Sequence, residues 1–169
     1  MLSIATAADI PQLLHLVNSA YRGAPSRKGW TTEADFLEGD LRIDEENLAA
    51  LLSKENAVIL KYSGDDFIIE GCVYLEKRGA RLYLGMLSVS PELQARGIGK
   101  KLLAAATAHA ANTGCRSVFM RVLSRRQELI EWYERHGYRQ TGVREPYDAP
   151  LKFGVFKEPL EFLILEKEV

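Results

Sequence analysis

The segment 94–102, Gln-Ala-Arg-Gly-Ile-Gly-Lys-Lys-Leu, combines residue types that bind an anion. Gly97 and Gly99 open a stretch with the apolar periodicity of a helix. The first turn of a helix has free N–H groups and the positive end of its dipole, and glycines let a phosphate approach the backbone. Arg96, Lys100 and Lys101 add positive charge there. The segment predicts a phosphate or diphosphate cradle; the alternative is a glycine-rich strand-to-helix turn with solvated basic side chains.

The spacing does not match the two commonest nucleotide-binding turns. A P-loop has a glycine five residues before its Gly-Lys pair and a Ser or Thr after the lysine, but this chain has Gln94 and Lys101 there. A dinucleotide-binding fingerprint has a third glycine further into the helix, where this chain has Leu102. Antiparallel hairpins, rather than parallel strands, are also predicted before the turn. Neither turn fits.

The elements that must position this segment follow from hydrophobic periodicity and turn residues. Strands are expected at 3–5, 57–62, 67–75, 81–89, 117–122, 139–143 and 161–165. Helices are expected at 10–21, 31–37, after Asp44, at 97–111 and at 127–136. Short turns join the strands of residues 57–89 into antiparallel hairpins. Residues 81–122 form a strand–helix–strand unit, which predicts two parallel strands joined by a right-handed crossover. The fold class is therefore mixed α/β, of the α+β kind.

Length and composition fit one domain spanning residues 1–169. The chain has 47% hydrophobic and 27% charged residues, which are ordinary values for a globular protein. Its 22 Lys and Arg against 23 Asp and Glu give a net charge of -1, so no general attraction to nucleic acid or anionic membranes is expected. No apolar run approaches the roughly 20 residues that cross a bilayer.

Cysteine and histidine usage predicts a cytoplasmic protein without a structural metal site. Cys72 and Cys115 lie in separate apolar stretches and no secretory leader precedes them, so buried, reduced cysteines are expected. The three histidines, His15, His109 and His136, are far apart and have no cysteine at ligand spacing.

Two motifs together resemble a known family. Residues 94–99 resemble the [Gln/Arg]-x-x-Gly-x-[Gly/Ala] signature of the GNAT superfamily of acyl-CoA N-acyltransferases, and Val-Ser-Pro at 89–91 precedes it as is usual there. Residues 132–138, Trp-Tyr-Glu-Arg-His-Gly-Tyr, are similar to the aromatic-Tyr-x-x-x-Gly-aromatic ending of the family's last helix. The resemblance implies a single, mostly antiparallel central sheet of about six to seven strands flanked by helices. It also implies a parallel, splayed strand pair at the cofactor site.

The resemblance implies acetyl-CoA as co-substrate and assigns residues to it. Backbone groups of Leu87 and Val89 would bond the pantetheine arm, because the family leaves the edge of this strand free. Backbone amides would hold the pyrophosphate at Gln94, Ala95, Arg96, Gly97, Ile98, Gly99 and Lys100. Arg125 or Arg126 would meet a further phosphate, although the Asn that the family often has near there is absent.

Tyr133 is similar to the family's general acid. When an amine attacks an acetyl thioester, the leaving thiolate needs a proton, and a phenol with a pKa of about 10 can supply it to a thiol of about 8.5. The alternative is a core aromatic on the same helix face as Leu129 and Ile130.

The general base is less clearly marked. An amine with a pKa of about 8–10 is mostly protonated at pH 7 and must lose a proton before it attacks. Many family members carry a Glu on the strand that ends at Val89, but residues 84–88 include no carboxylate. We take Glu33 as the first candidate, with Glu70 and a relayed water as alternatives. An ordinary surface carboxylate is the other interpretation of either Glu.

The acceptor site is expected around Tyr21, Arg22 and Trp30, because the family builds it from its first two helices and late loops. Trp30 is either a pocket wall or a core residue. Tyr147 is a further candidate; it lies in the loop between the last two expected strands, called the late loop here, which contains Pro146, Pro150 and Pro159.

The resemblance implies an N-acetyltransferase that moves an acetyl group from acetyl-CoA to a primary amine of a small molecule or peptide, by direct attack in a ternary complex. The alternatives are transfer of a longer acyl group and a non-catalytic acyl-CoA-binding sensor. Neither nucleic acid nor a membrane is an expected partner. A homodimer is left open, because many relatives pair through their sheets.

Overall fold

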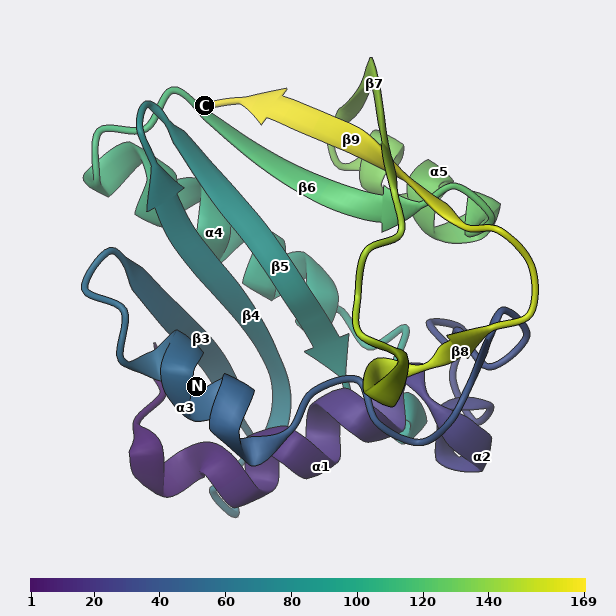
Figure 1. Cartoon of the computed structure of the whole chain (residues 1–169). Coiled ribbons are helices and arrows are strands. Elements are labelled where there is room, and N and C mark those ends of the chain that lie inside the picture. Colours follow the sequence, from purple (N-terminus) through teal and green to yellow (C-terminus); the bar gives the residue numbers. More distant parts are fainter.

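A seven-stranded sheet forms the centre of the computed structural model, which describes residues 1–169 (Figure 1). Its strands follow the order β1-β3-β4-β5-β6-β9-β7. Their bounds are β1 Leu2–Ile4, β3 Ala57–Ser63, β4 Ile69–Arg78, β5 Arg81–Val89, β6 Ser117–Leu123, β7 Arg139–Pro146 and β9 Glu161–Glu168. All neighbouring strands are antiparallel except β5 and β6, which are parallel. A separate two-stranded sheet pairs β2 (Leu37–Glu38) with β8 (Val155–Phe156).

Helices cover both faces of the sheet. The α-helices are α1 Ile10–Tyr21, α2 Gly23–Ser26, α3 Glu45–Leu52, α4 Ile98–Asn112 and α5 Gln127–Arg135. Three single-turn 3-10 helices are η1 Ala7–Asp9, η2 Pro91–Leu93 and η3 Leu151–Phe153. Figure 1 shows α1 and α3 on one side of the sheet and α4 behind it. None of the helices combines the length and the apolar character that a membrane span requires.

Two hydrophobic cores follow from the alternation of side chains along the strands. On β4, Cys72 and Tyr74 pack with α1 and α3, whereas Val73 and Leu75 pack with α4 and α5. A sheet covered on both faces explains why β4 is almost continuously buried.

The parallel pair β5–β6 diverges toward the carboxyl ends of its strands (Figure 1). The two strands pair only where 81–83 faces 117–119, although β5 continues to Val89. A bulge adds to the divergence: Met86 has a φ of 57°, and the register with β4 shifts between Cys72 and Tyr74. The part of β5 beyond Tyr83 therefore has a free edge toward β6.

The predicted fold class, sheet and helix layers are confirmed, but the helix expected at 31–37 is wrong. One turn forms there, in which the N–H groups of Phe36 and Leu37 both donate to the Glu33 carbonyl at 2.9 Å. The turn cannot continue, because Leu37 pairs with Phe156 in the small sheet. This pairing partner comes from the late loop, more than a hundred residues further along the chain.

Candidate functional site

A left-handed turn precedes α4 and exposes the start of that helix. Ala95 and Gly97 have φ values of 68° and 84°, and Gly97 is the residue that caps α4. The first bond into the helix is Lys101 N–H to Gly97 carbonyl at 3.1 Å. The N–H groups of residues 98–100 therefore lie before the hydrogen-bond ladder and are available to an anion.

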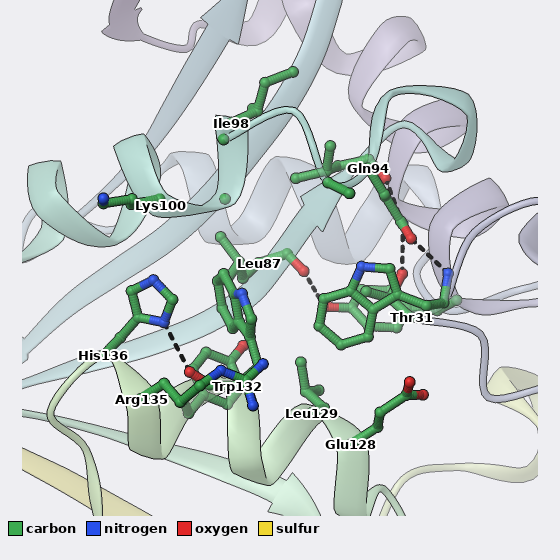
Figure 2. A pocket seen from close by; sticks show the side chains of 17 residues that line it. Thr31, Leu87, Gln94, Ile98, Lys100, Glu128, Leu129, Trp132, Arg135 and His136 are labelled. Carbon is green, nitrogen blue, oxygen red and sulfur yellow. Dashed lines mark hydrogen bonds between the residues drawn. The ribbon is translucent and has the colours of Figure 1, made fainter.

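A cavity of about 520 Å³ lies against this helix start (Figure 2). Its wall includes most of the residues that the sequence assigned to the cofactor: Leu87, Val89, Gln94, Ala95, Gly97, Ile98, Gly99 and Lys100. Tyr21, Trp30 and Tyr133 line the same cavity, whereas Arg96 is exposed and does not. The opposite wall is α5 with the residue that follows it: Trp132 of the helix and His136 just after its end face α4 (Figure 2).

Gly99 has a packing role in addition to the one predicted. A Cβ at this position would lie 3.2 Å from the Trp132 ring, closer than ordinary van der Waals contact. Trp132 in turn packs edge-on against Trp30, with ring centroids 5.9 Å apart. The second signature glycine thus lets α5 approach α4 and sets the width of the cavity.

The Gln94 side chain binds its own protein. Its Oε1 accepts from the Trp30 N–H at 2.7 Å, and its Nε2 donates to the Thr31 hydroxyl at 2.7 Å and the Val89 carbonyl at 3.0 Å. Both amide hydrogens are used, so the side chain positions the loop at 29–31 against the end of β5. Only the backbone of Gln94 remains for a cofactor.

The free edge of β5 presents donors rather than acceptors. The Leu87 carbonyl accepts a hydrogen bond from the Tyr21 hydroxyl, and the Val89 carbonyl accepts from Gln94. The Ser90 N–H donates to Glu70 on the β4 side at 2.9 Å. Because N–H groups alternate in direction along a strand, the Val89 N–H points to the open edge. Of the predicted pantetheine contacts, the two carbonyls are therefore already in use.

Tyr133 lies on α5 and is buried in the wall of the cavity. Its side chain is 4% exposed, between the rings of Trp132 and Tyr138 at 5.1 Å and 5.8 Å. Its hydroxyl makes no hydrogen bond with the protein. Burial raises the pKa of Tyr133 well above the ordinary 10.0, with a further contribution from Tyr21, so the phenol stays protonated at physiological pH.

A second cavity of about 490 Å³ adjoins the first. The two cavities share four lining residues: Tyr21, Leu87, Leu129 and Tyr133. The rest of the second cavity is formed by α3, the bulged part of β5, β6 and the late loop around Tyr147. Two ligands, one in each cavity, would therefore meet beside these four residues, Tyr133 among them.

Glu33 is buried at the edge of the second cavity and is held by two arginines. Its carboxylate pairs with Arg22 and, at 3.1 Å, with Arg126. Burial acts to raise the pKa of Glu33, but the charges of Arg126, Arg22 and Arg42 and the Arg22 hydrogen bond outweigh burial and lower it. A carboxylate stabilised in its ionised form is a weak base, so the geometry argues against the role expected of Glu33.

Two other expected roles are also not supported by the geometry. Arg126 donates hydrogen bonds to Glu33 and to the Thr31 carbonyl, so its guanidinium is already bonded within the protein and does not face a cofactor phosphate. Arg125 pairs with Glu158 at 3.3 Å. Glu70 lies beside Gly64 at the β3–β4 hairpin and lines neither cavity.

Comparison with known proteins decides the family. A family model described as the Acetyltransferase (GNAT) family matches residues 11–138. The chain belongs to the GNAT family. It is therefore an acyltransferase.

Solved structures share the fold of this GNAT chain at low sequence identity. The ribosomal-protein-S18-alanine N-acetyltransferase from Escherichia coli superposes with a TM-score of 0.74 at 14% identity, covering 100% of this chain and 93% of that chain. The ribosomal-protein-alanine N-acetyltransferase from Brucella melitensis gives 0.73 at 19% identity, with coverages of 100% and 99%. Nourseothricin acetyltransferase gives 0.58 at 24% identity, with coverages of 68% and 66%. No curated protein matches the sequence.

Arg42, Thr31 and Asp148 of this GNAT chain also line the two cavities, although the sequence did not indicate a place for them there. None of them belongs to a motif. Arg42 stands between Leu41 and the buried Ile43 in a segment without helix or strand periodicity. Its placement depends on contacts with α1, which a local pattern does not encode.

Proposed function

We propose that this GNAT protein transfers the acetyl group of acetyl-CoA to a primary amine of a small molecule or peptide, by direct attack in a ternary complex. The observation that carries the proposal is the position of Tyr133. It lines both cavities, and its hydroxyl has no partner in the protein. A proton donor at the meeting point of two substrate cavities suits a group transfer between them.

The chain's own groups account for binding on the α4 side. The N–H groups of residues 98–100 and the helix dipole would bind the diphosphate, with Lys100 beside them. The Val89 N–H would bind an amide carbonyl of the pantetheine arm. These donors would direct the thioester along the free edge of β5 toward Tyr133.

Tyr133 would protonate the thiolate as it leaves. Its raised pKa makes it a weaker acid than an ordinary phenol, but the same burial also raises the pKa of a thiol placed beside it. The proton therefore moves between two groups whose charged forms are both disfavoured there. The nitrogen of the tetrahedral intermediate carries one proton more than an amide and would release it to water as the C–S bond breaks. The tyrosine would regain its own proton from solvent once the product has left.

Loss of the acceptor's proton needs no protein carboxylate in this proposal. Two arginines pair with the single carboxylate of Glu33, and Arg42 lines the same cavity, so this part of the second cavity has a net positive charge. Nearby positive charge disfavours an ammonium and lowers the pKa of an amine bound there. We propose that the amine loses its proton to water as it enters.

Replacing Tyr133 by Phe tests the proposal, and Tyr138→Phe is a matched control. Both tyrosines are buried and have unpartnered hydroxyls, but Tyr138 lines neither cavity. We expect Tyr133→Phe to lower kcat for thiol release about 10²-fold or more, because a positioned acid contributes about 10²–10⁴-fold. The CoA affinity should change little, and Tyr138→Phe should retain normal kcat. Equal activity of the two variants would contradict the role of Tyr133.

Measuring turnover distinguishes the proposed acetyltransferase from the two alternative functions. An acyl-CoA sensor would bind CoA but release no thiol with any amine, and a transferase for longer chains would prefer a longer acyl-CoA over acetyl-CoA. The unbonded Tyr133 hydroxyl favours an enzyme over a sensor. The two free, buried cysteines, Cys72 and Cys115, support the proposal of a cytoplasmic setting.

A further inference from the structure

One arginine in the second cavity has no anionic partner. The cavity is lined by five basic side chains, Arg22, Arg42, Lys54, Arg121 and Arg126, and by two acidic ones, Glu33 and Asp148. Four of the five basic groups form ion pairs, with Glu33, Glu76, Glu145 or Asp148. The guanidinium of Arg42 makes neither an ion pair nor a hydrogen bond, and its carbon lies 5.6 Å from the Tyr21 ring centroid.

We propose that Arg42 binds a carboxylate of the acceptor, so that the acceptor is a small amino carboxylic acid. This inference rests on the proposed function and names its substrate class. A guanidinium is a planar fork that matches the two oxygens of a carboxylate. Arg42 is half-buried. The carboxylate of Glu33 in the same cavity is already paired with Arg22 and Arg126. A bound carboxylate would therefore supply the counter-charge that Arg42 lacks.

The backbone that carries Arg42 is fixed in advance. Asn18 on α1 accepts hydrogen bonds from the N–H groups of Arg42 and Ile43, and its Nδ2 donates to the Ile43 carbonyl at 3.1 Å. The Ile43 side chain is buried in the core on the α1 face. An arginine on a fixed backbone loses less freedom when it binds a ligand, which increases affinity.

The contacts of Tyr21 limit the length of the acceptor. Arg42 lies over the Tyr21 ring, and the Tyr21 hydroxyl bonds to the Leu87 carbonyl where the two cavities meet. An acceptor with its carboxylate at Arg42 would therefore lie along the Tyr21 ring, with its amine toward the residues that line both cavities. A short amino acid fits this placement.

The late loop forms one wall of the second cavity. Its residues Tyr147, Asp148 and Phe153 line the cavity. Arg22 holds the loop by donating to the Phe153 carbonyl at 3.1 Å, and Lys152 pairs with Asp44 at 2.9 Å. A wall fixed in this way limits the room for a longer chain, which favours a small molecule over a peptide.

The test compares three forms of each L-amino acid as acceptors: the acid, its carboxamide and the corresponding decarboxylated amine. All are assayed with acetyl-CoA at the same pH. We expect kcat/KM for at least one acid to exceed that of its two neutral-ended analogues by about 100-fold, the range of a hydrogen-bonded charge pair. Arg42→Gln should raise KM for the acid by a similar factor with little change in kcat. It should leave the amide and CoA binding unaffected, and Arg42→Lys should restore part of the affinity.

Arg125→Gln is the matched control, because Arg125 is exposed and lines neither cavity; its kinetics should be normal. Carboxamides or plain amines that react as well as the acids would overturn the inference, and so would an Arg42→Gln variant with equal losses for acid and amide. If CoA binds but no amine reacts, the proposed function fails instead. Calorimetry of the same compounds with the CoA-loaded protein then decides the inference: heat for the acids alone supports it, and no difference overturns it.

Discussion

At the scale of single residues, a side chain's role here is set by what it contacts. The place of Tyr133 at the cavities could be predicted from the sequence because its motif lies within one helix and the turn that follows it. Glu33 could not, because the arginine that pairs with it at 3.1 Å is 93 residues away and belongs to no motif. The carboxylate that looked like a candidate base is instead held in its ionised form.

The pH dependence of the reaction should reflect the acceptor rather than the protein. The pKa of Tyr133 is raised well above 10.0 and that of Glu33 is lowered, so neither group changes its charge between about pH 6 and pH 10. We expect kcat/KM to rise with pH until the acceptor's ammonium has lost its proton and then to stay level up to pH 10. A pH–rate profile with acceptors of different amine pKa checks this, since the midpoint should follow the acceptor. A midpoint that does not move, or a fall below pH 10, would argue for a titrating protein group.

At the scale of elements, the site depends on contacts between segments that are distant in sequence. The start of α4 was predictable because glycines and a capped, periodic stretch are local signals. The loop at 29–31 was not, because the Gln94 side chain fixes it from the other side of the cavity. The predicted helix at 31–37 failed for the same reason: the late loop supplies a strand partner that no local pattern shows.

Gln94→Ala should loosen this loop and the cofactor cavity together. The change removes three hydrogen bonds, two of them to residues 30 and 31, and each such bond contributes about 0.5–1.5 kcal/mol. We expect CoA affinity to fall about tenfold and the free energy of unfolding to fall by about 1–3 kcal/mol. Gln127→Ala, which removes an exposed pair with Glu131, is the control. Unchanged CoA affinity in Gln94→Ala would show that the loop does not shape the cavity.

At the scale of the whole molecule, Glu33 joins the two halves of the chain. Arg22 ends α1, Arg126 precedes α5, and the carboxylate between them connects the elements that flank the two cavities. The sequence predicted the sheet and its layers from periodicity, but it did not predict this central ion pair. The two partners of an ion pair can be distant in the sequence. Because charged residues are common, the sequence alone does not show which acidic residue pairs with which basic one.

Removing the Glu33 charge should destabilise the protein and change its response to acid. Glu33→Gln leaves two buried guanidinium groups without a counter-charge, which costs about 3–5 kcal/mol. Because the folded pKa of Glu33 lies below its usual 4.5, the carboxylate contributes stability above pH 4.5 that is lost as the pH falls through the folded value. Denaturant unfolding at pH 7 and at pH 3 checks both points: the difference between wild type and variant should be large at pH 7 and smaller at pH 3. Glu92→Gln, which breaks an exposed pair with Lys28, should differ from wild type by less than about 1 kcal/mol at either pH.

A crystal structure with CoA would show whether the thioester reaches Tyr133. We expect the diphosphate on the N–H groups of residues 98–100, the pantetheine arm along the free edge of β5, and the sulfur within hydrogen-bond reach of the Tyr133 hydroxyl. A diphosphate bound elsewhere, or a sulfur outside the reach of Tyr133, would contradict this expectation.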